Sequence, residues 1–85
     1  MDKQEIINEC KVILKEYATN KDKVDTINDG DEIAETLGLD SLDLVEMVMA
    51  LEDKFNISIA EEDIANIKTF KDIVSYIENA LKEKN

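Results

Sequence analysis

The apolar residues of this chain recur at intervals of three and four, and this periodicity limits the fold to packed helices. It is clearest in the segments 6–17 and 70–81, where it places apolar side chains along one face of an α-helix. The sequence has no proline, and its two glycines are Gly30 and Gly38. Signals that break a helix are therefore concentrated between residues 19 and 40. The pattern predicts an all-α fold in which helices flank one long loop.

The predicted fold class is a small four-helix bundle with three longer helices and one short third helix. The first helix is expected over residues 3–17, the second from Asp40 to Phe55, the short one around 61–66, and the last from Thr69 onward. Asp40 and Thr69 are each followed three residues later by an aspartate, which is typical of a capping box at a helix start. The long loop between helices one and two is expected to be pinned by three apolar side chains, those of Ile27, Ile33 and Leu37.

The length and composition allow one small domain, over residues 1–85, and exclude several kinds of chemistry. The chain has 85 residues, 44% of them hydrophobic, with no histidine and one cysteine. No imidazole base and no metal site built from cysteines alone is available, so no catalytic residue and no metal ligand is predicted. Cys10 lies within the apolar stripe of the first helix and is assigned to the core. The acidic start resembles no targeting signal and no apolar run has membrane-spanning length, so a cytoplasmic protein is expected.

Negative charge is concentrated in the middle of the chain. Ten lysines face 21 acidic residues, for a net charge of −11, and residues 29–63 hold twelve of the acids against Lys54 alone. This balance argues against binding to nucleic acid or insertion at an anionic membrane and favours basic protein partners. The second helix also carries apolar residues beyond its core stripe, namely Leu42, Val45 and Met49. Acidic residues beside exposed apolar residues are typical of a surface that docks a partner protein. The alternative interpretation is that the acidic residues only form a solvated face.

The residues around Gly30 do not fit the calcium-binding loop of an EF-hand. If Gly30 takes the sixth position of an EF-hand loop, Asp25 and Asp29 fall on ligand positions one and five. The third position is then Ile27 and the twelfth is Thr36, so one oxygen ligand and the bidentate carboxylate are missing.

Ser41 is the residue best placed for a chemical role. It lies in the first turn of the second helix, where unpaired amides and the helix dipole favour an anionic group. No histidine or lysine is near it in the sequence, so it is a poor nucleophile by itself and a better acceptor of a phosphoryl group from another enzyme.

The run Leu37-Gly38-Leu39-Asp40-Ser41-Leu42-Asp43, followed by Val45-Glu46-Met47-Val48-Met49-Ala50-Leu51-Glu52, resembles an acyl carrier protein of the fatty-acid synthesis type. The resemblance extends over about residues 33–77. It implies a four-helix bundle in which Ser41 carries 4′-phosphopantetheine, transferred from coenzyme A by a phosphopantetheinyl transferase. The thiol of the arm would bear acyl chains as thioesters, and the chain itself, expected to be a monomer, would catalyse nothing.

The resemblance also implies roles for residues around Ser41. Fatty-acid synthesis enzymes with basic docking patches would bind a partner-binding set comprising Asp40, Leu42, Asp43, Val45, Glu46 and Met49. The acyl cavity would be bordered by Leu51, Ile59, Ile64 and Ile67. The sequence departs from the family at Leu39, where a small residue is usual, and at Ala60, where proline is common.

Two alternatives stay open at this point. The chain could be a carrier for another pathway, handling polyketide, aminoacyl or D-alanyl groups. It could also be an acidic helical interaction module that is never modified.

Overall fold

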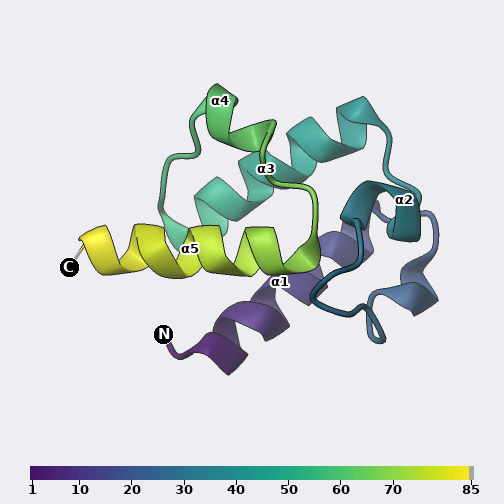
Figure 1. Ribbon diagram of the computed structural model, residues 1–85, viewed down its shortest axis with the longest axis horizontal. Coiled ribbons are helices and arrows are strands. Elements are labelled where there is room, and N and C mark those ends of the chain that lie inside the picture. The colour runs from purple at the N-terminus through teal and green to yellow at the C-terminus, as the bar shows by residue number, and fades with distance from the viewer. Residues whose placement is uncertain (85) are drawn as a thin grey trace.

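Three long helices form the frame of the molecule, as Figure 1 shows for a computed structural model that describes residues 1–84, with side chains up to residue 83. The long helices are α1 (Lys3–Tyr17), α3 (Ser41–Phe55) and α5 (Phe70–Lys84), each of 15 residues. The short helices are α2 (Ile33–Leu37) and α4 (Glu61–Ile64), and a 3-10 turn, Lys21–Lys23, follows α1. The predicted small all-α bundle is confirmed, and α1 has the predicted bounds.

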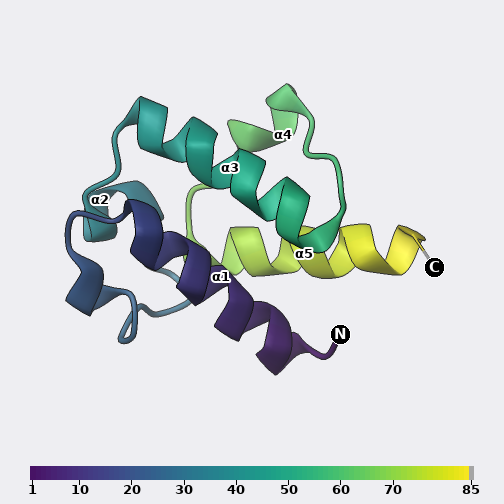
Figure 2. The same cartoon turned by 180° about the vertical axis from the view of Figure 1, so that it is seen from behind.

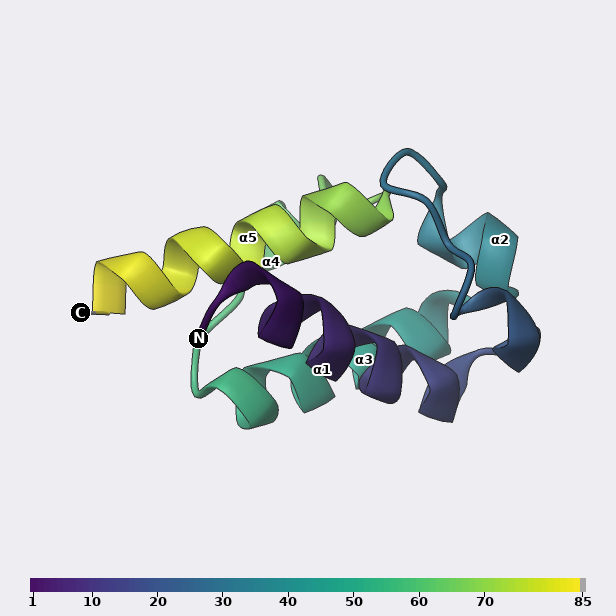
Figure 3. The same ribbon diagram turned by 90° about the horizontal axis from the view of Figure 1, so that it is seen from below.

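The core lies where the three long helices meet. α1 contacts both α3 and α5 (Figure 3), and each helix contributes the stripe of apolar residues that its spacing predicts. The buried side chains of these helices are Ile6, Cys10, Ile13 and Leu14 of α1, Met47, Val48, Leu51 and Phe55 of α3, and Phe70, Ile73, Val74 and Ile77 of α5. Removal of this apolar surface from water is the main force that holds the bundle together.

The connection between α1 and α3 contains more structure than the sequence pattern predicts. Ile27, Ile33 and Leu37 are buried as expected, and Val24 joins them in the core. The loop is also tied to the start of α5, because the Ile33 amide donates to the Lys68 carbonyl at 2.9 Å and the Phe70 amide donates to the Asp31 carbonyl at 3.1 Å. α2, with five residues, is too short to show a helical repeat in the sequence, and these tertiary contacts explain how it forms.

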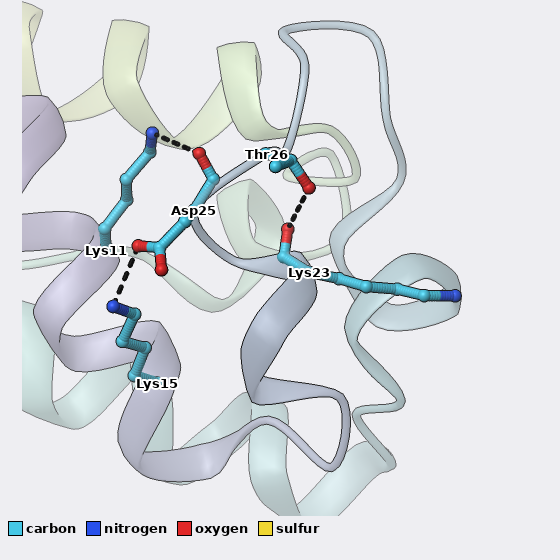
Figure 4. A network of polar contacts seen from close by, with 5 residues as sticks. All are labelled: Lys11, Lys15, Lys23, Asp25 and Thr26. Atoms are coloured by element: carbon cyan, nitrogen blue, oxygen red, sulfur yellow. Dashed lines mark hydrogen bonds and ion pairs between the residues drawn. The ribbon is translucent and has the colours of Figure 1, made fainter.

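Polar contacts hold the first half of this connection against α1 (Figure 4). The Lys15 ammonium lies 2.8 Å from the Asp25 carboxylate, and the Lys11 ammonium donates to the Asp25 carbonyl at 3.3 Å. The Thr26 hydroxyl makes only a local contact, donating to the Lys23 carbonyl at 3.5 Å. Exposed pairs of this kind add little stability, but they fix the path of the chain after α1.

The short helix α4 ends at Ile64, two residues before its predicted end, and the chain continues through a turn. Two side-chain hydrogen bonds hold the segment around it. The Ile59 amide donates to the Glu52 carboxylate at 2.8 Å, and the Tyr76 hydroxyl donates to the Asp63 carboxylate at 2.8 Å. A helix of four residues has almost no hydrogen bonds of its own, so its length is set by these neighbours.

The start of α3 lies beside α2, at the end of the molecule away from the N-terminus, as Figures 1 and 2 show from opposite sides. Ser41, the first residue of α3, therefore lies at this end of the molecule. Within residues 1–84, no helix has both the length and the apolar character needed to cross a membrane.

Candidate functional site at the start of α3

A left-handed turn at Gly38 directs the chain from α2 into α3. Gly38 has φ 71° and ψ 51°, a conformation that costs glycine little and strains residues with a Cβ. The amides of Gly38 and Leu39 both donate to the Ala34 carbonyl, the latter at 2.9 Å, which closes α2 as in a Schellman motif. Leu39, one of the two departures from the pattern that the sequence resembles, is buried in the core. The larger side chain therefore anchors the turn just before the site.

A capping box fixes the first turn of α3, as the sequence predicts. The Asp43 amide donates to the Asp40 carboxylate at 2.8 Å, and the Asp40 amide donates to the Asp43 carboxylate at 3.1 Å. The Leu44 amide donates to the Asp40 carbonyl at 3.0 Å. In the part of the chain that the structure describes, the amides of Ser41 and Leu42 are left without a hydrogen-bond acceptor.

Ser41 is the first residue of α3 and is exposed. Ser41 carries one of the two free amides and Leu42 the other, at the positive end of a 15-residue helix. An anionic group attached to the Ser41 hydroxyl oxygen can accept hydrogen bonds from those amides, whereas the Asp40 and Asp43 carboxylates partly offset the attraction. The geometry suits a hydroxyl that receives a phosphoryl group from outside, and no imidazole in the chain can deprotonate it.

Four of the six predicted partner-binding residues share the outer side of α3, namely Leu42, Val45, Glu46 and Met49. The exposed fractions of Leu42, Val45 and Met49 are 65%, 51% and 59%, and Glu46 is exposed between them. Asp40 is exposed and Asp43 is half-buried. The predicted exposure of the second apolar stripe is confirmed, and α3 has one apolar face in the core and another in contact with water.

The four residues predicted to border an acyl cavity lie in and around the core. Leu51 and Ile59 are buried, and Ile64 and Ile67 are half-buried and packed against the same cluster. A cavity of about 640 Å³ lies elsewhere, between the chain after α3, α4 and the last turns of α5. Its lining comprises Asn56, Ile57, Ser58, Asp63, Tyr76, Asn79, Ala80 and Glu83, none of which is among the four predicted residues. The pairing of Tyr76 with Asp63 across this space gives no signal in the sequence, because the two residues are 13 positions apart.

Cys10 is unsuited to chemistry. The thiol is fully buried in α1, and burial, with a smaller contribution from the Glu9 carboxylate, raises its pKa from 9.0 to about 12. The assignment of Cys10 to the core is confirmed. Among the described side chains, no three acids or thiols gather in a way that could hold a metal ion.

Known proteins resemble this chain in both sequence and structure. Residues 12–77 match the model of a family described as "Phosphopantetheine attachment site". An acyl carrier protein from Campylobacter lari is 42% identical over 72 residues, which cover 85% of this chain and 90% of the relative. One from Coprothermobacter proteolyticus is 36% identical over 84 residues, which cover 99% of this chain and 100% of the relative. The crystal structure of an acyl carrier protein from Thermotoga maritima superposes with a TM-score of 0.83 at 28% identity, covering 100% of this chain and 96% of that one.

Proposed function

Because the chain belongs to the phosphopantetheine-attachment family of acyl carrier proteins, we propose that it carries acyl chains on an arm attached to Ser41. The cofactor of this family is 4′-phosphopantetheine, whose terminal thiol holds acyl groups as thioesters. The observation that carries the assignment to Ser41 is its position as the exposed first residue of α3, where its own amide and that of Leu42 are free. Fatty-acid synthesis is the pathway that the resemblance favours.

Loading of Ser41 requires a separate phosphopantetheinyl transferase. A bond forms between the Ser41 Oγ and the phosphorus next to the pantetheine group of coenzyme A. The phosphoanhydride bond to the adenosine bisphosphate part breaks, and the hydroxyl proton passes to a base of the transferase. The product is a phosphodiester with one negative charge, which the Ser41 and Leu42 amides can stabilise. The chain supplies the acceptor oxygen and its setting, and the transferase supplies the catalysis.

Partner enzymes are proposed to dock on the outer side of α3. Leu42, Val45 and Met49 would supply apolar contact area, and Glu46 with Asp40 and Asp43 would steer basic patches toward the site. The charge of −11 supports basic partners over nucleic acid or an anionic membrane surface. The same mutual repulsion supports a monomer, and a cytoplasmic location agrees with the free thiol of Cys10.

The acyl chain is proposed to shelter beside Leu51, Ile59, Ile64 and Ile67. These side chains already pack against the core, so a chain that enters among them must separate α4 from the long helices. α4 is suited to this movement because it has four residues and few hydrogen bonds of its own. A single domain over residues 1–85 agrees with the continuous core that includes residues from all three long helices.

The attachment site is tested by intact mass after incubation with coenzyme A and a phosphopantetheinyl transferase. Wild type should gain the mass of one arm, and Ser41→Ala should gain none while folding normally, because the side chain is exposed. Ser58→Ala and Ser75→Ala are matched controls and should be loaded like wild type. A loaded Ser41→Ala protein would refute the assignment, and a wild type that is never loaded would favour the unmodified interaction module. Loading of the arm with fatty-acyl, aminoacyl or D-alanyl groups by the respective enzymes then separates the pathways.

A further inference from the structure

The segment that follows α1 is hydrogen-bonded to the end of α2, close to the turn that leads to the proposed attachment site. The amides of Thr19 and Asn20 both donate to the Leu37 carbonyl, each at 3.0 Å. The side-chain amide of Asn20 donates to the Thr36 carbonyl at 3.4 Å. The last carbonyls of a helix have no partner within the helix, and here a segment 18 residues earlier in the chain supplies the donors.

Thr19 extends this contact to the turn that leads into α3. Its hydroxyl donates to the Gly38 carbonyl at 3.0 Å. A Cβ on Gly38 would lie 3.1 Å from the Thr19 Cβ and 3.5 Å from its Oγ1, so the threonine side chain covers the face of Gly38 where other residues carry a side chain. Among the hydrogen bonds of the described residues, the bond from Thr19 is the one that connects the Gly38 turn to a side chain far away in the sequence.

The turn at Gly38 determines how Ser41 is presented. Leu39 and Asp40 alone separate Gly38 from Ser41. Leu39 is held in the core, and Asp40 is held by its capping box with Asp43. The carbonyl of Gly38 is the remaining polar group of the turn, and Thr19 holds it. Loss of this bond would leave the Leu39 amide, which donates to the Ala34 carbonyl at 2.9 Å, as the one hydrogen bond of the peptide between Gly38 and Leu39. The turn would loosen, and the first turn of α3 would move with it.

We propose that Thr19 is a positioning residue for the loading of Ser41. The inference rests on the proposed attachment of the arm to Ser41. Transfer of a phosphoryl group requires the acceptor oxygen to be held in line with the bond that breaks, and a small displacement of that oxygen lowers the rate strongly. Thr19 acts through the Gly38 turn and is not one of the residues on the outer side of α3 that are proposed to bind partners. It therefore affects the turnover step rather than the docking step.

The test compares the loading kinetics of three variants with wild type. Thr19→Val keeps the shape of the side chain and removes the hydroxyl, Thr19→Ser restores the hydroxyl, and Thr26→Val is the matched control. Thr26 lies in the same loop and its hydroxyl makes only the local contact with Lys23 (Figure 4). Initial rates are measured with a phosphopantetheinyl transferase and coenzyme A over a range of carrier concentrations, at a temperature where circular dichroism shows every variant folded.

Thr19→Val should lower kcat by about two- to tenfold, the range that corresponds to one net hydrogen bond. The KM for the carrier should not change, because the outer side of α3 is intact. Thr19→Ser should recover most of the rate, and Thr26→Val should match wild type. Hydrogen exchange gives a second readout: Thr19→Val should speed exchange of the Leu39 amide, which closes the turn onto Ala34, and leave the amide of Leu51 unaffected.

A Thr19→Val protein with the kcat of wild type, or one whose only change is a raised KM, overturns the positioning role. A loss that Thr26→Val reproduces, or that Thr19→Ser does not recover, overturns it as well. These outcomes leave the attachment site intact, since wild type is still loaded. Failure of wild type to accept the arm, or loading of Ser41→Ala, overturns the attachment site and the positioning role together.

Discussion

Truncation of two leucines on opposite faces of α3 should separate stability from docking. Leu51 is 2% exposed within the core, and Leu42 is 65% exposed on the outer side. The substitution Leu→Ala is chemically the same at both positions, so any difference in outcome comes from the environment. The two variants are matched controls for one another.

Leu51→Ala should destabilise the fold by about 2–5 kcal/mol, because it removes apolar contacts and leaves a cavity in a packed core. For a domain of this size, each kcal/mol lowers Tm by about 4–8 °C, so a loss of about 3.5 kcal/mol, near the middle of that range, lowers Tm by about 14–28 °C. Leu42→Ala removes a side chain that is mostly in water, and its effect on the free energy of unfolding should stay within about 0.5 kcal/mol. Thermal unfolding followed by circular dichroism measures both.

Leu42→Ala should instead weaken binding to partner enzymes. The substitution removes three carbon atoms, each worth about 0.8 kcal/mol when fully buried. Since 65% of the side chain is available to be covered, the loss on docking is roughly 1.5 kcal/mol, or about tenfold in Kd. Calorimetric titration with a phosphopantetheinyl transferase measures this quantity. Equal destabilisation by the two substitutions, or unchanged binding of Leu42→Ala, would refute the assignment of two distinct faces.

Three further outcomes are expected. Glu46→Lys should change the free energy of unfolding by no more than about 0.5 kcal/mol because the side chain is exposed. The variant should associate with the transferase more slowly than wild type at low salt. Equal association rates of variant and wild type at low salt would show that the acidic face is only solvated. Hydrogen bonds from the amides of Thr69 and Lys68 hold the pKa of Asp72 below its usual range, so its stabilising effect is complete above the pKa of the unfolded chain and is lost as the pH falls through the folded pKa. The Tm difference between wild type and Asp72→Asn should therefore be larger at neutral pH than at a pH well below the usual pKa of an aspartate, and a constant difference would contradict this linkage. The thiol of Cys10, with its pKa raised to about 12, should resist iodoacetamide in the native protein at about pH 8 and react in urea. Labelling is measured by mass, and rapid labelling of the native protein would show that the thiol is accessible.

The sequence by itself determined the parts of this protein that depend on local interactions. The spacing of apolar residues predicted the three long helices and their buried faces, because a helical repeat persists over 15 residues. The capping boxes at Asp40 and Thr69 were also predictable, since both partners lie within one turn. The exposed stripe through Leu42, Val45 and Met49 followed from the same periodicity.

The tertiary structure alone decided the features that depend on residues far apart in the chain. α2 forms where the loop packs on the core and is hydrogen-bonded to residues 68–71. A helix of five residues is too short to show a helical repeat of apolar residues in the sequence. The bond from Tyr76 to Asp63 and that from Thr19 to Gly38 join residues 13 and 19 positions apart. Their formation depends on how the helices pack rather than on local sequence, because a hydrogen bond requires two groups within about 3.5 Å and a pattern along one chain does not specify that distance.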